Sequence, residues 1–141
     1  MSHIVVPGAC LCGAVAFELE LPTKWIAHCH CSMCRRAHGA PYVTWVGMVS
    51  EQVRVTSGSE HLERYRSSPG GGRCFCRLCG SSLFFEHERW AGETHVALAN
   101  MLGELDREPQ VHAFFSDKAP WVHVDDGLPR RGGVTGTEPL D

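Results

Sequence analysis

Eight cysteines fall into three short stretches of this 141-residue chain. The sequence CLC (10–12) holds two, HCHCSMC (28–34) holds three, and RCFCRLC (73–79) holds the other three. Cysteine thiolates are nucleophiles, redox groups and ligands for borderline metal ions, so such clusters predict chemistry. Disulfides are the alternative, but cysteines two residues apart on a strand are poorly placed to pair with each other. We therefore favour metal binding.

The first and last clusters predict a closed four-cysteine zinc site. Zinc binds four ligands in a tetrahedron. Residues i and i+2 of a strand face the same way, so Cys10 and Cys12 can present two sulfur atoms to one ion. Cys76 and Cys79 have the C-x-x-C spacing of a zinc knuckle, and Gly80 allows the backbone to turn under the metal. Such a site would add folding free energy to a small domain.

Four cysteines are not assigned to this site: the middle cluster of Cys29, Cys31 and Cys34, and the single Cys74. Three protein ligands and an exchangeable fourth position form the usual pattern of a catalytic zinc site. The spacing alone leaves two alternatives open. Cys74 could be a fourth ligand that closes the site, or a C-x-x-C pair could act as a redox dithiol.

Short β-strands are predicted to position these cysteines. The segment GAVAFELEL (13–21) alternates apolar and polar residues, as a half-buried strand does, and WIAHCHC (25–31) predicts a second strand that enters the middle cluster. SMCRRAHG (32–39) predicts a short helix with Ser32 as its N-cap and Gly39 at its end. SPGGG (68–72) is a strong turn signal. Further strands are expected within 41–49, 53–58, 61–68, 82–88, 94–101 and 111–116, although ALANMLGEL (97–105) could instead be helical.

The length and composition predict one mainly β domain over residues 1–129, followed by a flexible tail over 130–141. The net charge of −3 gives no basic surface for nucleic acid. No apolar run approaches the length of a membrane helix, and the amino terminus lacks the pattern of a signal peptide. We therefore expect a cytoplasmic protein without nucleic-acid or membrane partners; the sequence does not indicate its oligomeric state.

Several linked motifs resemble one known family. They are GACLCGAVAFELE, AHCHCSMCRRAHGAP, YRSSPGGGRCFCRLCGSSLF, and HAFFSDKAPW followed by DGLP, and they span about Gly8 to Pro129. In this order and at these intervals, they resemble the glutathione-dependent formaldehyde-activating enzyme family. That family also includes centromere protein V and many bacterial carbon–sulfur lyase homologues.

The resemblance implies a β-tent fold of short antiparallel strands with zinc knuckles and little helix. It implies two zinc ions: a structural one on Cys10, Cys12, Cys76 and Cys79, and a second on Cys29, Cys31 and Cys34 with an exchangeable position. It also implies a zinc-dependent carbon–sulfur lyase that acts on a thiol adduct such as S-hydroxymethylglutathione, with the middle cysteines as the catalytic group. Formaldehyde adds to thiols without help, so a non-catalytic glutathione carrier or protein-binding module is the alternative.

Glutathione carries two carboxylates, so its pocket should contain cations. Arg35 and Arg36 directly follow the middle cluster and are our candidates for binding it, although a solvated helix face is the alternative for each. Arg73 and Lys118 are further candidates.

The sequence indicates the roles of the histidines close to the cysteines less specifically. His28 and His30 alternate with the cysteines and, on a regular strand, point away from the metal. We predict that they pack or lie behind the ligands. His38 suits a helix end, and His112 could line the pocket or lie on a half-buried strand. No residue is identified as the general acid or base.

Cys74 departs from the family pattern, which usually has a small or polar residue at this position. The family manages without this thiol, so we interpret Cys74 as an additional cysteine, although a fourth sulfur could still close the second site. Methionine sulfoxide reductase activity through Cys74, suggested by the similar fold of the B-type reductases, is the weakest alternative because fold alone does not determine function.

Overall fold

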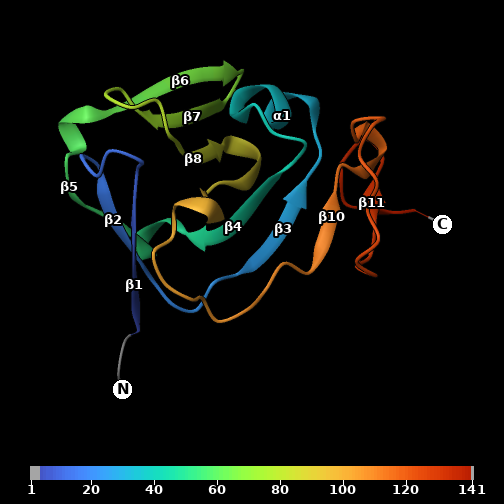
Figure 1. The fold of residues 1–141 in the computed structure, drawn as a ribbon, viewed down its shortest axis with the longest axis horizontal. Helices are drawn as coiled ribbons and strands as arrows, with labels where there is room; N and C mark the ends of the chain where they lie inside the picture. Colours follow the sequence, from blue (N-terminus) through green and yellow to red (C-terminus); the bar gives the residue numbers. More distant parts are fainter. Residues whose placement is uncertain (1–3, 141) are drawn as a thin grey trace. The chain divides into compact units, whose positions relative to one another are not determined.

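The alternating segment near the amino terminus forms strand β2 (Ala16–Glu20) in the computed structural model, which describes residues 4–140. Phe17 and Leu19 are buried, whereas the acidic residues next to them stay partly exposed. β2 pairs antiparallel with β1 and β5 in a three-stranded sheet of order β1-β2-β5 (Figure 1). The predicted half-buried strand is thus confirmed.

Strands make up most of the regular structure among the described residues. Their bounds are β1 Val5–Ala9, β2 Ala16–Glu20, β3 Trp25–Cys29, β4 Val43–Val49, β5 Val53–Ser57, β6 Leu62–Ser68, β7 Gly71–Cys76, β8 Ser82–His87, β9 Glu93–Ala97, β10 Val111–Ala113, β11 Arg131–Gly132 and β12 Glu138–Pro139. The helical elements are α1 Ser32–His38 and the single 3-10 turns η1 Ser50–Gln52, η2 Ser59–His61, η3 Glu88–Trp90, η4 Leu98–Asn100 and η5 Phe115–Asp117. The predicted mainly β fold with little helix is confirmed.

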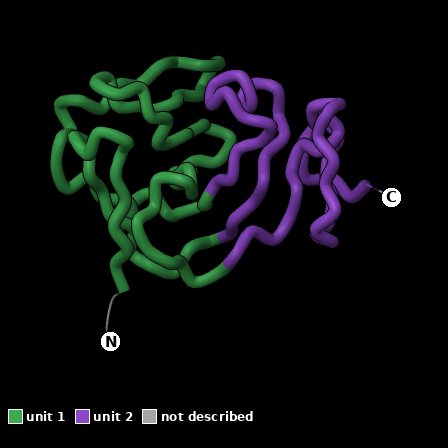
Figure 2. Tube along the Cα trace, in the orientation of Figure 1, with its two compact units in different colours: residues 1–24, 46–107 green, residues 25–45, 108–141 purple. Residues whose placement is uncertain are grey.

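The chain divides into two compact units, drawn in separate colours in Figure 2. The first unit contains residues 1–24 and 46–107, and the second contains residues 25–45 and 108–141. Each unit therefore combines segments that are distant in the sequence. The five cysteines of the first and last stretches belong to the first unit, and the middle cluster belongs to the second.

In the first unit, β6 to β9 follow one another as neighbouring strands in the order β9-β8-β7-β6. β6 and β7 pair antiparallel around the predicted turn, where Gly70 has φ 75°. β7 in turn pairs with β8 and ends at Cys76. Phe17 of β2 packs edge-on against Phe84 of β8, with ring centroids 5.0 Å apart. These strands place one half of the four-cysteine cluster at the end of β7.

In the second unit, β10 lies parallel to β3, as Figure 1 shows. The register places His112 opposite His28 and Ala113 opposite Cys29. The helix α1 follows β3 after a two-residue link and contains seven residues. This unit thereby brings the middle cluster next to a segment more than 80 residues away in the sequence.

The segment expected to be a flexible tail has some regular structure. β11 and β12 pair antiparallel, with Arg131 opposite Pro139 and Gly132 opposite Glu138. The backbone N–H of Phe114 also donates to the carbonyl oxygen of Gly136 at 2.8 Å. The domain boundary between residues 129 and 130 stays a prediction.

Across residues 4–140, no helix has both the length and the apolar character needed to cross a membrane.

Candidate metal centres

Cys10 and Cys12 lie in a tight turn after β1 rather than on the strand itself. The Cys10 N–H donates to the Val15 carbonyl at 3.0 Å, and the Cys10 carbonyl accepts from Gly13 N–H at 3.0 Å. Gly13 has φ 80°, a left-handed conformation that glycine adopts at little steric cost. The expectation that a regular strand presents the two sulfur atoms was therefore wrong. The turn brings them within 3.7 Å of each other.

Cys76 and Cys79 lie on a knuckle that begins where β7 ends. The N–H of Gly80 donates to the Cys76 carbonyl at 2.7 Å, and Gly80 has φ 82°. Its predicted role in turning the backbone is thus confirmed. The Cys79 sulfur lies 3.2 Å from the Ser81 hydroxyl, and hydrogen bonds from that hydroxyl and from the Ser81 N–H lower the pKa of Cys79 to about 5. Cys79 is thereby biased toward the thiolate form that binds metal.

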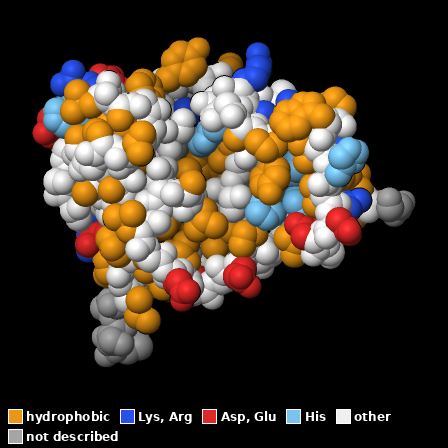
Figure 3. Space-filling view, viewed as in Figure 1, with side chains coloured by type: hydrophobic (Ala, Val, Ile, Leu, Met, Phe, Trp, Pro, Cys, Tyr) orange, Lys and Arg blue, Asp and Glu red, His pale blue; other side chains and the backbone are white. Residues whose placement is uncertain are grey.

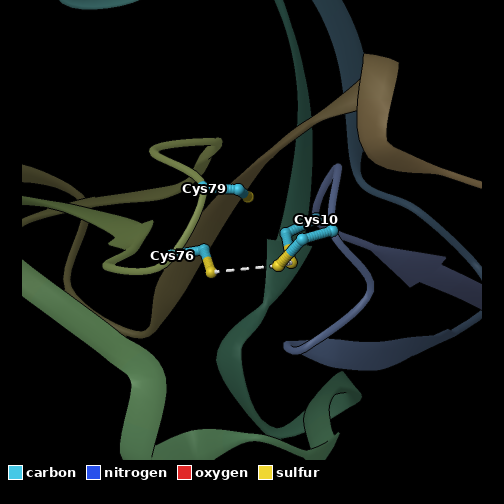
Figure 4. Close-up of side chains that lie close together, drawn as sticks. Cys10, Cys76 and Cys79 are labelled. Atoms are coloured by element: carbon cyan, nitrogen blue, oxygen red, sulfur yellow. Dashed lines mark hydrogen bonds between the residues drawn. The ribbon is translucent and has the colours of Figure 1, made fainter.

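The sulfur atoms of Cys10, Cys12, Cys76 and Cys79 all lie within 4.8 Å of one another. The Cys12 and Cys76 sulfurs are 3.9 Å apart. Figure 4 shows the labelled side chains of Cys10, Cys76 and Cys79 pointing toward a common centre from two segments of the chain. Four sulfurs at the zinc–sulfur distance of ~2.3 Å form a tetrahedron with edges of about 3.8 Å. The donor set therefore fits a closed zinc site.

The middle cluster is assembled by the end of β3 and the start of α1. Cys29 is the last residue of β3, Cys31 is the N-cap of α1, and Cys34 lies in its first turn. The Cys31 sulfur accepts a hydrogen bond from the Cys34 N–H at 3.3 Å. The predicted N-cap, Ser32, was therefore wrong, because the cysteine before it performs that role. The predicted end of the helix at Gly39 is confirmed, with φ 60° at that residue.

The three sulfur atoms of this cluster also lie within 4.8 Å of one another, and those of Cys29 and Cys34 are 3.6 Å apart. Cys29 and Cys34 are buried, while Cys31 is partly exposed. Hydrogen bonds with the two neighbouring thiols, followed by burial, raise the pKa of Cys29 far above its ordinary value. Three thiolates this close together repel one another unless a cation neutralises their charge. A bound metal ion would supply that charge and keep the three thiols deprotonated. The cluster could hold a metal with three protein ligands.

Cys74, the eighth cysteine, lies on β7 in the first unit, opposite Phe84 of β8 and Arg64 of β6. Its side chain is buried, and burial followed by the nearby Glu86 carboxylate raises the pKa of Cys74 to about 11. Within the described residues of its own unit, the middle cluster contains no fourth His, Cys, Asp or Glu ligand.

The candidate anion-binding arginines have different surroundings. Arg35 donates from Nε to the His30 carbonyl at 3.3 Å and from Nη2 to the Asp117 carbonyl at 3.1 Å. Arg36 is exposed and donates only weakly, at 3.4 Å, to the Ser32 carbonyl within its own helix. Arg35 therefore braces the backbone between Cys29 and Cys31 of the middle cluster, whereas Arg36 projects from the surface.

Arg73 and Lys118, the two further candidates for binding a carboxylate, belong to different units. Lys118 lies in the second unit and donates from Nζ to the Val122 carbonyl at 3.0 Å. Arg73 lies in the first unit, with its guanidinium 4.7 Å from the centre of the Phe85 ring.

The histidines of the second unit form a connected group. His30 is fully buried, and its Nε2 lies 2.8 Å from His112 Nδ1. His112 is also buried, and its Nε2 lies 2.8 Å from a carboxylate oxygen of Asp126. His28 packs beside His112, with ring centroids 4.9 Å apart. His28 and His30 thus pack against other side chains, while a position behind metal ligands stays a prediction. His112 is a buried histidine on the short strand β10.

Sequence reasoning did not single out Asp126, although it lies in the DGLP segment that resembles the family motif. Nothing in the local pattern links Asp126 to residues on β3, because the link is made by the parallel pairing of β10 with β3. His38 contacts the ring of Trp45 edge-on, with centroids 5.2 Å apart, near the end of α1.

Residues 5–117 match the sequence profile of a family described as glutathione-dependent formaldehyde-activating enzyme. A Halomonas elongata protein named "Putative glutathione-dependent formaldehyde-activating enzyme" is 31% identical over 131 residues, which cover 86% of this chain and 82% of that protein. A Schizosaccharomyces pombe protein named as an uncharacterised lyase is 30% identical over 80 residues, covering 57% of this chain and 56% of its own length.

Among solved structures, a Rhodobacter sphaeroides protein is similar, with a TM-score of 0.61 and 31% sequence identity. The similarity covers 72% of this chain and 92% of that protein.

Proposed function

The chain belongs to the glutathione-dependent formaldehyde-activating enzyme family, and from this premise we propose that it is a zinc-dependent carbon–sulfur lyase. Its substrate would be a thiol adduct such as S-hydroxymethylglutathione. The main supporting observation is the cluster of Cys29, Cys31 and Cys34, which offers three sulfur ligands, whereas the other cluster offers four. Three ligands leave a position for a substrate, and four do not.

The two clusters would have different tasks. Cys10, Cys12, Cys76 and Cys79 would hold a structural zinc that joins the turn after β1 to the knuckle after β7. Cys29, Cys31 and Cys34 would hold the second zinc. When bound there, zinc lowers the pKa of a coordinating thiol and so supplies the sulfur of the substrate as a thiolate at neutral pH.

The reaction needs no external oxidant or reductant. In the synthetic direction the sulfur of glutathione forms a bond to the carbon of formaldehyde, and the thiol proton is transferred to the oxygen, which becomes a hydroxyl. The reverse direction breaks the same bond and returns both molecules.

The residues of this chain would bind and orient the substrate. Arg35 holds the His30 carbonyl and so fixes the backbone between Cys29 and Cys31. We propose that Arg35 and Arg36, next in sequence to the metal ligands, also attract the carboxylates of glutathione. A cytoplasmic location fits this proposal, because thiols are kept reduced there.

A direct test is to measure exchange between ¹³C-formaldehyde and S-hydroxymethylglutathione by NMR, with and without catalytic amounts of protein. We expect the wild-type protein to raise the exchange rate above the spontaneous rate in proportion to its concentration. Cys31→Ser should abolish this increase, and Cys74→Ser should keep it. Stoichiometric binding of glutathione without faster exchange would contradict the lyase and support the carrier, and neither binding nor exchange would support a binding module for another partner.

A further inference from the structure

A third group of potential metal ligands lies in the second unit and contains no cysteine. It consists of His28 on β3, His112 on β10 and Asp126 in the segment that follows. One ligand atom from each lies within 4.8 Å of the other two. The parallel register places His28 and His112 side by side, and the Asp126 Oδ2 atom lies 2.8 Å from His112 Nε2.

Each of these three side chains is held by a contact through its other polar atom. The His28 Nδ1 atom lies 2.8 Å from the Thr44 hydroxyl oxygen, and His112 Nδ1 lies 2.8 Å from His30 Nε2. The Asp126 Oδ1 atom accepts from the Leu128 N–H at 3.1 Å. Metal-binding histidines in proteins are usually oriented in this way, through the ring nitrogen that does not bind the metal. His112 Nε2 and Asp126 Oδ2, which contact each other at 2.8 Å, and the His28 ring nitrogen that does not contact Thr44 would then hold a shared ion.

The group is enclosed on one side and open on the other. The Tyr42 ring lies 4.9 Å from the His28 ring, and the Phe115 ring lies 5.6 Å from the His112 ring. His112 is only 1% exposed, but the side chain of Asp126 is 41% exposed. Figure 3 shows histidine side chains beside acidic side chains on the face that it draws. The partly exposed side chain of Asp126 would give an ion a route from solvent.

This group differs from the middle cysteine cluster in both donor type and position. His28 and Cys29 are consecutive residues of β3, so their side chains point to opposite faces of the strand. Two imidazoles and one carboxylate are borderline and hard ligands, which suit ions such as Zn²⁺, Co²⁺, Ni²⁺ and Fe²⁺. The cysteine clusters offer only sulfur.

We propose that His28, His112 and Asp126 form a third metal site, which binds a divalent transition-metal ion through two imidazoles and one carboxylate. This site goes beyond the proposed lyase function and does not depend on it. The competing possibility is a metal-free hydrogen-bonded chain from His30 through His112 to Asp126, in which no ion binds.

The test uses the full chain with both cysteine clusters filled by zinc, at a measured content of two zinc ions per chain. Co²⁺ is then added and followed by native mass spectrometry, isothermal titration calorimetry and visible absorption. We expect one Co²⁺ to bind with the weak absorption of nitrogen and oxygen ligation and without a thiolate charge-transfer band. Added Zn²⁺ should displace it.

The variants Asp126→Asn and His28→Gln should each weaken Co²⁺ binding at least about tenfold. Asp125→Asn and His123→Gln are matched controls, because they change an exposed carboxylate and an exposed histidine nearby, and they should bind Co²⁺ like the wild type. The retained content of two zinc ions and an unchanged circular dichroism spectrum show that a variant is folded. If only one of the two ligand variants folds, that variant decides the result.

Absence of a third ion in the wild type would overturn the proposal in favour of the metal-free chain. Equal binding by the wild type and the folded ligand variant would overturn it as well, because the ion would then lie elsewhere. A thiolate charge-transfer band would show that Co²⁺ had entered a cysteine cluster.

Discussion

Seven of the eight cysteines lie in two groups in which the sulfur atoms face one another, and Cys74 is outside both groups. Three of the sulfur–sulfur distances, Cys29–Cys34 at 3.6 Å, Cys10–Cys12 at 3.7 Å and Cys12–Cys76 at 3.9 Å, are close to the edge of a zinc–sulfur tetrahedron. In the middle cluster, hydrogen bonds with the neighbouring thiols and burial raise the pKa of Cys29, whereas in the four-cysteine cluster hydrogen bonds from Ser81 lower the pKa of Cys79 to about 5. At the scale of single residues, the proposed chemistry therefore depends on which thiols could share an ion.

Replacement of a ligand in the four-cysteine cluster should destabilise the protein strongly. We expect Cys76→Ser to lose one zinc ion and to lower the free energy of unfolding by more than about 3 kcal/mol, because the metal contributes folding free energy. Cys74→Ser, two residues away and also buried, should cost only about 1 kcal/mol and keep both zinc ions. Zinc analysis with denaturant unfolding measures both effects. Loss of zinc from Cys74→Ser would identify Cys74 as a ligand.

Arg35 and Arg36 should differ in their effect on activity. Arg35→Gln removes a charge that also braces the His30 and Asp117 carbonyls, so we expect a fall of at least about tenfold in kcat/KM for the glutathione adduct. Arg36→Gln removes an equal charge from an exposed position and should raise KM by less than about threefold. Steady-state kinetics of the Arg35→Gln and Arg36→Gln variants, measured at two ionic strengths, compares the two losses. Equal losses in the two variants would refute the assignment of the larger role to Arg35.

At the scale of the elements, the cysteines are positioned by turns and a helix cap rather than by long strands. Gly13 and Gly80 allow the two turns of the four-cysteine cluster through left-handed backbone conformations. Cys31 is both a cap of α1 and a member of the middle cluster, so the start of the helix and the cluster form together. The sequence predicted the knuckle and the end of the helix. It did not predict the turn at Cys10. It also placed the cap one residue late, because Ser32 is of a type that usually caps helices and lies directly after Cys31.

Gly80→Ala tests whether the knuckle supports metal binding. A Cβ at Gly80 would meet no atom within 4 Å, so the cost arises from the φ of 82° alone and should be about 1 kcal/mol. Gly92→Ala is a matched control, with φ 85° and equally open surroundings. Both variants should lose similar stability with zinc bound, but only Gly80→Ala should bind the structural zinc more weakly in a chelator competition. Equal zinc affinities would contradict the role of the knuckle.

The hydrogen bonds of Asp106 should stabilise the first unit at neutral pH and lose this effect in acid. Burial opposes ionisation, but hydrogen bonds from the Thr23 hydroxyl and N–H, at 2.6 and 3.0 Å, hold the pKa of Asp106 below its ordinary value of 3.8. The pKa is depressed in the folded state, so this contribution is fully present above pH 3.8 and is lost as the pH falls through the folded value. We expect Asp106→Asn to be about 1 kcal/mol less stable at pH 7, with the difference shrinking as the pH falls below 3.8. Denaturant unfolding at pH 7 and at several pH values below 4 measures it, and a difference that stays constant or grows as the pH falls would contradict the assignment.

At the scale of the whole molecule, each of the two units contains its own cysteine cluster and is assembled from two separate stretches of chain. The second unit depends on the pairing of β3 with β10, which are far apart in the sequence. Its middle cluster joins β3 to α1, so the zinc ion that we propose at this cluster should stabilise local structure in that unit.

Hydrogen–deuterium exchange on Cys31→Ser tests this expectation. Loss of the second zinc should increase exchange in residues 25–45 and 108–141, because the link between β3 and α1 is weakened. Residues 1–24 and 46–107 should keep their protection, since their four-cysteine cluster is intact. Cys34→Ser should reproduce the pattern, whereas Cys76→Ser should first increase exchange in the other unit. Uniform exchange across both units in Cys31→Ser would show that the metal acts globally.

The sequence by itself determined the strand pattern, the two cysteine groups and the family, because each depends on residue types at short, fixed spacing. The sequence did not predict the 3-10 turns, the cap at Cys31 or the turn at Cys10. Neighbouring side chains compete for the same backbone hydrogen-bonding groups, and only the structure shows which of them binds. Only the tertiary structure joined His28, His112 and Asp126. Parallel pairing between strands distant in the sequence sets that register, and no local periodicity encodes which residues then lie opposite each other.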